Sequence, residues 1–172
     1  MRNSGRFCRI DLFIMEVSNS KLISLVLMRL AIGWHFLYEG LAKVFNPSWS
    51  SKTYLLDSGG FLKGFFEWMT YNQSVLKTVD FMNTWGLTLI GLSLILGLFS
   101  RYAARAGMIL LGLYYLSHPA FHGISYLFPS DGSYFLVNKT IIEIFALYVI
   151  SAWPTDHIIG IQRFMDNKKK TN

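Results

Sequence analysis

Six ionisable or imidazole side chains occur inside, or at the ends of, apolar stretches of this sequence. Charged groups are costly in hydrocarbon, so several that converge indicate a functional site. Histidine and carboxylate groups take up and release protons, and a histidine N–H can donate to an oxygen of a bound ligand. The chemistry predicted for this set is therefore proton transfer inside an apolar protein. The six residues are His35, Glu39, His118, His122, Lys139 and Glu143.

The composition is that of an integral membrane protein. Of 172 residues, 52% are hydrophobic and 15% are charged, whereas about 25% of a soluble domain is charged. Backbone in lipid must satisfy its own hydrogen bonds, so apolar segments long enough to span are expected to be helices. The sequence predicts an all-α four-transmembrane-helix bundle. Its predicted spans are 22–41, 85–99 (or 81–99 if the helix starts earlier), 103–121 and 134–153.

The basic residues predict the orientation of the bundle. Most of the 16 Lys and Arg residues fall on the side that holds both termini and the 100–104 turn, which places the termini in the cytoplasm. Residues 1–20 and 154–172 are then cytoplasmic tails around a transmembrane domain at 21–153, and Met15 is an alternative start. The net charge is +6. Because the basic residues cluster at the ends of apolar segments, the predicted partner is membrane lipid, not nucleic acid.

The first predicted span carries its charges and glycines on one side. At about 100° per residue, Arg29, Gly33, Gly40 and Lys43 form a stripe, and glycines there would let a neighbouring helix approach closely. Arg29 lies deep in the span and needs a carboxylate or carbonyl partner. Two roles remain open for it: tying helices together, or extending its charge toward the membrane surface.

Helical rise places the remaining ionisable groups at one depth. At about 1.5 Å per residue, His35 and Glu39, the two histidines of the third span, and Glu143 of the fourth reach the outer leaflet at similar height. Each also has a simpler interpretation. Lys139 and Glu143 at i,i+4 form a salt bridge. The third-span histidines are interfacial in preference to a zinc or haem pair, because Pro119 interrupts their helix.

Two segments outside the spans have amphipathic patterns. Residues 59–69 combine a row of aromatic side chains with Lys63 and Glu67 at i,i+4, which predicts a short helix in the first outer loop. A cover over the bundle is favoured over a gate above a ligand site. Residues 158–165 could form a second short helix on the cytoplasmic surface.

No dedicated cofactor motif is present. The chain lacks a nucleotide-binding Gly-rich loop and a Walker motif, and its single Cys8 excludes a dithiol. A redox cofactor must therefore be soluble in lipid or be held by a partner. A quinone would suit, because its ring needs an apolar slot and its carbonyl oxygens need a proton donor such as His or Tyr.

Two stretches resemble the DoxX superfamily of four-helix membrane proteins, which includes the small DoxD subunit of thiosulfate:quinone oxidoreductase. The similarity covers roughly residues 22–165. One departure concerns a Glu that many members carry early in the second helix, where this chain has Leu87 and Thr88. The matching stretches are MRLAIG at 28–33 continuing through FLYEG at 36–40 to Lys43, and WGLTLIG at 85–91 continuing to GLFSR at 97–101.

The resemblance implies a multi-pass protein of the prokaryotic inner membrane. It favours a subunit of a quinone-linked oxidoreductase that passes electrons from a partner oxidoreductase subunit to a membrane quinone, either alone or as a homo-oligomer. A non-enzymatic anchor or scaffold and a small-solute carrier remain as alternatives, and no metal is expected. The predicted catalytic residues are His35, Glu39, His118 and Glu143, and the predicted quinone-binding residues are Arg29, Tyr38, Lys43 and His122.

Overall fold

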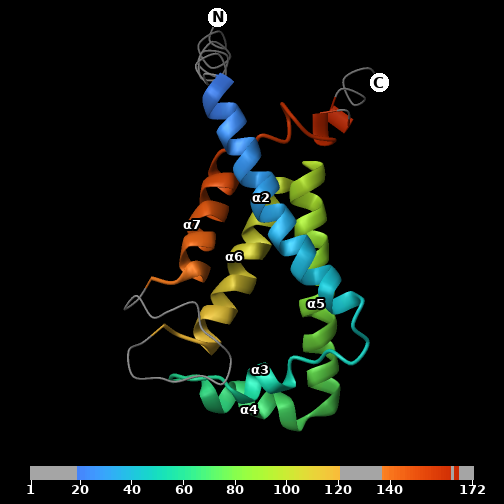
Figure 1. Ribbon diagram of the computed structural model, residues 1–172, viewed down its shortest axis with the longest axis vertical. Helices are drawn as coiled ribbons and strands as arrows, with labels where there is room; N and C mark the ends of the chain where they lie inside the picture. The colour runs from blue at the N-terminus through green and yellow to red at the C-terminus, as the bar shows by residue number, and fades with distance from the viewer. Residues whose placement is uncertain (1–18, 121–136, 164, 167–172) are drawn as a thin grey trace, which may run out of the picture.

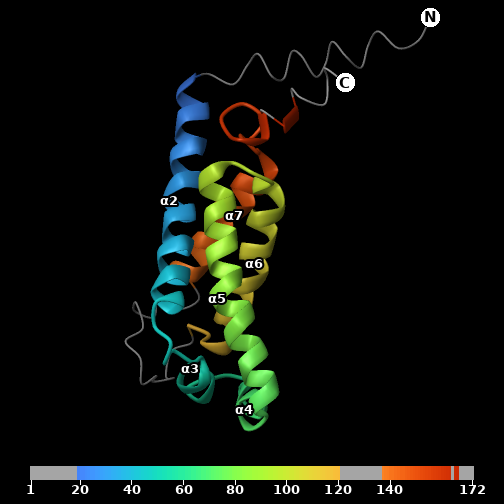
Figure 2. The same cartoon turned by 90° about the vertical axis from the view of Figure 1, so that its right-hand side faces the viewer.

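The computed structural model describes residues 19–120, 137–163 and 165–166. The described residues form six helices, four of them long, and confirm the all-α class (Figure 1). The long helices run along the molecule, while α3 and α4 lie across one end (Figure 2). The helices are α2 (Asn19–Val44), α3 (Lys52–Leu56), α4 (Lys63–Tyr71), α5 (Gln73–Leu96), α6 (Ser100–Ser117) and α7 (Lys139–Ala152).

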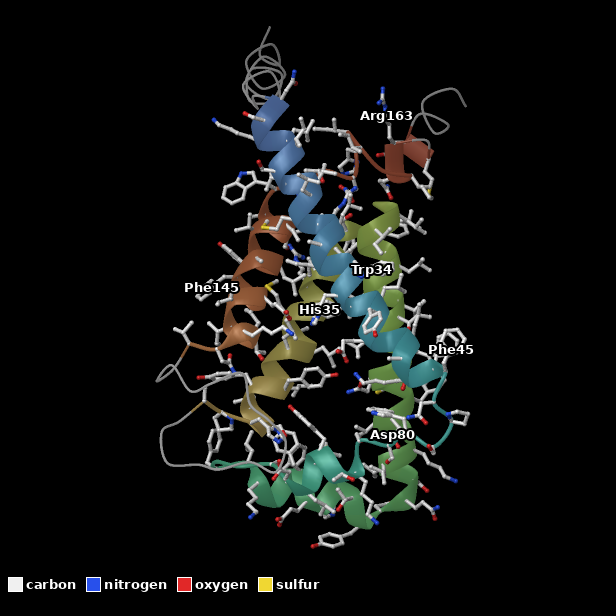
Figure 3. All side chains as sticks on the ribbon, viewed as in Figure 1. Trp34, His35, Phe45, Asp80, Phe145 and Arg163 are labelled. Atoms are coloured by element: carbon white, nitrogen blue, oxygen red, sulfur yellow. The ribbon has the colours of Figure 1, made fainter. Side chains whose placement is uncertain are left out.

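The four long helices pack as a ring. Helix α2 contacts α5 and α7, and α6 contacts the same two neighbours from the other side. A core of apolar side chains fills the ring and includes Phe36, Leu94 and Leu147, each at most 1% exposed. Large apolar side chains also cover the outer faces, among them Trp34, and Figure 3 shows Phe145 directed away from the bundle. An apolar exterior suits lipid better than water.

Length and composition support two of the four predicted spans. Among the described residues, α2 with 26 residues and α5 with 24 residues are long and apolar enough to cross a membrane. At about 1.5 Å per residue, both exceed a hydrocarbon core of about 30 Å. Helices α6 and α7, with 18 and 14 residues, do not meet the same criterion.

Capping residues explain where the observed helices differ from the predicted spans. Helix α5 starts well before Trp85, because the Asn72 side chain accepts from the Ser74 and Val75 N–H groups and so satisfies the helix start. Helix α7 starts at Lys139, later than predicted, where Asn138 caps it in the same way. Helix α6 ends two residues before Pro119, as expected for a residue that cannot continue a helix.

The glycine stripe of α2 forms the closest helix contact. A Cβ atom on Gly40 would overlap Thr88 of α5, and one on Gly91 would overlap the backbone of Leu37. These glycines therefore let the two backbones touch, which confirms the role predicted for Gly33 and Gly40. The contact fixes how α2 is rotated and so which of its side chains face α6 and α7.

The segments outside the ring match the predictions in part. Helix α4 confirms the amphipathic helix predicted within 59–69 and buries Phe66, whereas α3 was not predicted. The helix considered for 158–165 does not form as such: residues 158–161 are turns, and helix begins only at Gln162. This stretch packs on the end of α5, where Ile161 N–H donates to the Leu96 carbonyl.

Candidate functional site

A cavity of about 160 Å³ lies inside the ring of helices, mainly between α2, α6 and α7. We call it the polar cavity. Both ionisable and apolar side chains line it. Its lining residues are His35, Phe36, Glu39, Lys43, Leu87, Leu111, Tyr114, Lys139, Thr140 and Glu143.

Helical spacing brings three of these groups to the cavity from α2. His35, Glu39 and Lys43 follow each other at i,i+4, so they lie above one another on one face. Lys43 Nζ is 3.5 Å from Glu39 Oε2. The close packing of α2 against α5 turns this face toward α6 and α7, and Figure 3 shows His35 in that position. The glycines hold a neighbouring side of α2 against α5, which leaves the side with these ionisable groups facing the cavity.

The central contact of the polar cavity joins α2 to α7. His35 Nε2 lies 3.4 Å from Glu143 Oε1, with side chains that are 36% and 17% exposed. A carboxylate beside an imidazole can accept a hydrogen bond from it and so orient the ring. Such a pair can take a proton from one side and release it on the other, which is the requirement for a proton relay.

The structure brings together four of the eight predicted site residues: His35, Glu39, Lys43 and Glu143. Sequence analysis did not assign Tyr114, Lys139 or Thr140 to the site. Lys139 was among the six converging residues but received no catalytic or binding role beyond a salt bridge with Glu143. The available signal for Tyr114 was its position one turn before His118, together with the general suitability of a phenol as a proton donor.

His118 lies outside the polar cavity. It follows the last residue of α6, stacks on Tyr54 with ring centroids 4.0 Å apart, and places Nε2 3.7 Å from Asp57 Oδ2. Burial lowers the pKa of His118, and the nearby Asp57 carboxylate opposes this shift. His118 therefore belongs to the contact between α6 and the α3 segment, and its predicted partner His122 lies outside the described residues.

Arg29 is almost completely buried, at 2% exposure, and also lies outside the polar cavity. Its Nη1 donates to Thr155 Oγ1 at 2.9 Å, and its Nη2 donates to the Ile159 carbonyl at 2.8 Å. The carbonyl partner that the sequence required is thus supplied by the stretch after α7. Tyr38, at 63% exposure, points away from the cavity.

The site offers hydrogen-bonding and ionisable groups, but the described residues contain no group of three or more His, Cys, Asp or Glu side chains that could hold a metal ion. Leu87 forms part of the cavity wall. The region in which the family resemblance implies a Glu therefore presents an apolar side chain to this cavity.

Two long apolar helices and an apolar exterior indicate a helical membrane protein. Comparison with known families gives the class a name. The model of the DoxX family matches residues 24–119, more than half of the chain, and the protein belongs to that family. No curated protein and no solved structure matches the chain. The matched region contains α3 to α6 and all of α2 except its first five residues, whereas Glu143 and the partners of Arg29 lie beyond it.

Proposed function

We propose that this protein is the membrane subunit of a quinone-linked oxidoreductase, which passes electrons from a partner protein to a membrane quinone. The observation that carries the proposal is the His35–Glu143 pair at a cavity within an apolar bundle. Membership of the DoxX family supports it, because that family includes a subunit of a quinone-linked enzyme.

The proposal places all four long helices across the prokaryotic inner membrane, with both termini in the cytoplasm. The outer faces of α6 and α7 support this, since Ile109, Leu113, Ile142 and Phe145 are all exposed large apolar side chains. Such faces would be unfavourable in water and suit lipid. The distribution of Lys and Arg supports the orientation.

The proposed reaction takes two electrons and two protons. A redox centre of the partner protein is oxidised and gives the electrons, and each quinone carbonyl oxygen becomes a hydroxyl by taking one proton. The polar cavity would supply these protons. At about 30 Å³ for each liquid water, it has room for roughly five waters, which together with His35, Glu143 and Glu39 would form a relay.

The test uses the full-length protein, purified from membranes with its partner and reconstituted in lipid vesicles. Quinol formation is followed by absorbance. His35→Gln should reduce turnover by about 10²-fold, the lower range for loss of an acid–base group. His157→Gln is the matched control, because its Nδ1 pairs with Asp166 at 2.7 Å outside the cavity. Turnover by His35→Gln equal to that of the wild type would contradict the relay.

The alternative of a non-enzymatic anchor or scaffold predicts a different pattern. Wild-type protein would then show neither bound quinone nor quinone-dependent turnover, while complex assembly would survive His35→Gln. A small-solute carrier would instead show uptake into liposomes that depends on Arg29 and Glu143. These outcomes separate the three functions in one preparation.

A further inference from the structure

A second, larger cavity of about 470 Å³ lies between the α3–α4 pair and the α5–α6 pair, and it opens on the outer face of α6, where Ile109 and Leu113 line it. We call it the apolar cavity. Its walls come from apolar side chains of all four helices, including Leu55, Phe66, Ile90 and Leu113. Sites for small organic ligands commonly measure about 300–1,000 Å³ and combine apolar walls with a few polar groups. The apolar cavity fits this description in both size and composition.

The polar groups of the apolar cavity include a hydrogen-bonded pair, Asn83 of α5 and Tyr114 of α6. Asn83 Nδ2 donates to Tyr114 Oη at 2.7 Å. Asn83 Oδ1 is buried and has no hydrogen-bond partner among the described residues. A buried carbonyl oxygen without a donor is unfavourable, so a ligand group that donates a hydrogen bond to this atom would be stabilised.

The Tyr114 hydroxyl complements that oxygen. It accepts from Asn83, so its own proton is free to point to a different acceptor. The two side chains thus present one donor and one acceptor at the same wall. A quinone carbonyl oxygen can accept from the Tyr114 O–H, and the hydroxyl of the quinol product can donate to Asn83 Oδ1. A lipid acyl chain has neither group.

Tyr114 also lines the polar cavity, together with His35 and Glu143. One side chain therefore stands between an apolar space of ligand size and the His35–Glu143 pair proposed to move protons. The sequence-based hypothesis put the quinone among the ionisable groups. The two cavities instead differ in their lining: the smaller one is lined by ionisable groups, and the larger one has the apolar walls that a ring requires.

We infer that the quinone ring binds in the apolar cavity, with one of its oxygens between Asn83 and Tyr114. Tyr114 is then the group through which protons from the polar cavity reach the ring. This inference rests on the proposed quinone-linked function and adds the place where the substrate binds. It assigns ligand-binding roles to Asn83 and Gly86 and a proton-donor role to Tyr114.

Glycines provide a matched pair of variants. Gly86 lines the apolar cavity, and a Cβ atom built on it meets nothing within 4 Å. Gly86→Leu should therefore fill the cavity without displacing the backbone. A Cβ atom on Gly112 also meets nothing within 4 Å, yet Gly112 lines neither cavity. Gly112→Leu is thus the matched control, because it makes the same substitution in a helix but lies outside the proposed site.

The experiment measures binding of short-tailed benzoquinone and naphthoquinone analogues to the full-length protein in lipid nanodiscs by equilibrium dialysis. Gly86→Leu and Asn83→Leu should each raise Kd by at least about tenfold, since they remove ligand space or an orienting hydrogen bond. Gly112→Leu should bind as the wild type does. Tyr114→Phe should lower turnover far more than affinity. Ala106→Leu, from the α6 wall, replaces Gly86→Leu if that variant does not fold.

Failure of the site and failure of the function give different results. If Gly86→Leu and Asn83→Leu bind both analogues as tightly as the wild type, while His35→Gln does not bind them, the ring lies in the polar cavity and the inference is wrong. If the wild type shows no saturable binding and native mass spectrometry finds phospholipid that Gly86→Leu lacks, the cavity holds an acyl chain. If neither binding nor quinone-dependent turnover is found, the proposed function itself falls.

Discussion

Arg29 and His35 lie on the same helix, fewer than two turns apart, yet their surroundings differ. Arg29 is 2% exposed and donates through both terminal nitrogens to the stretch after α7. His35 is 36% exposed, makes a 3.4 Å contact with Glu143, and lines a cavity. A charge in an apolar bundle is therefore not a sign of chemistry by itself. Arg29 is closely packed and holds helices together, whereas His35 lies beside a cavity and has space to exchange a proton.

The largest expected effect is on stability, at the Arg29 end. Arg29→Met leaves the Thr155 hydroxyl and the Ile159 carbonyl without their donor, which should cost on the order of 3 kcal/mol or more. We expect a lower unfolding temperature in detergent and faster tryptic cleavage at the exposed Arg163. Arg101→Met, at an exposed position of α6, is the control. If the two variants unfold alike, Arg29 is not the structural tie that the comparison requires.

The next effect is on rate, at the polar cavity. Glu143→Gln keeps the shape of the side chain but removes the charge that supports His35, so turnover should fall by about 10²-fold. Stability should change by less than about 1 kcal/mol, as for other partly exposed contacts between ionisable side chains. Glu67→Gln, which removes the carboxylate of the 3.7 Å pair with Lys63 on α4, is the control. If Glu143→Gln instead lost much stability and kept normal turnover, the His35–Glu143 pair would have a structural role, as Arg29 does.

A smaller effect on stability tests the packing around Arg29. Gly97 ends α5 in the left-handed region with φ of 62°, and an added Cβ would lie 2.7 Å from Gly160 Cα and 3.1 Å from the Arg29 guanidinium. Gly97→Ala should therefore cost at least about 1–2 kcal/mol from its backbone conformation alone. Gly112→Ala, which meets open space, should leave the unfolding temperature equal or higher. Equal effects would show that this end is loosely packed.

The smallest effect concerns His118, which belongs to neither region. Burial lowers its folded pKa below the ordinary value of 6.5. Below pH 6.5 the unfolded state therefore binds more protons, so stability is complete above that pH and falls as the pH drops toward the folded pKa. The unfolding temperature should decrease between pH 7.5 and 5.5, and less steeply in His118→Gln. An identical decrease in both proteins would assign the dependence to other groups.

The sequence predicted the helical class and the glycine contact because both depend on local pattern. Apolar runs of sufficient length require helices in lipid, and Gly33 and Gly40 fall on one side of α2 whatever its neighbours are. Helix ends were less predictable. The start of α5 depends on the Asn72 side chain, and polar residues near position 73 gave no hydrophobic signal to extend the span.

The candidate site was predicted where one helix supplies it. His35, Glu39 and Lys43 follow from i,i+4 spacing within α2, and Glu143 follows from its depth in the last span. Depth does not give rotation, however, so His118 was grouped with His35, although the structure pairs it with Asp57 instead. Tyr114 was missed because its value comes from the two cavities that it separates.

The sequence alone determined which groups are present and roughly how deep each lies, because rise per residue and side-chain chemistry are local properties. Only the tertiary structure decided which of them meet. Contact between α2 and α5 through glycines set the rotation of α2, and the return of residues 155–162 to the end of α5 gave Arg29 its partners. Both depend on contacts between residues far apart in the chain, which no local pattern specifies.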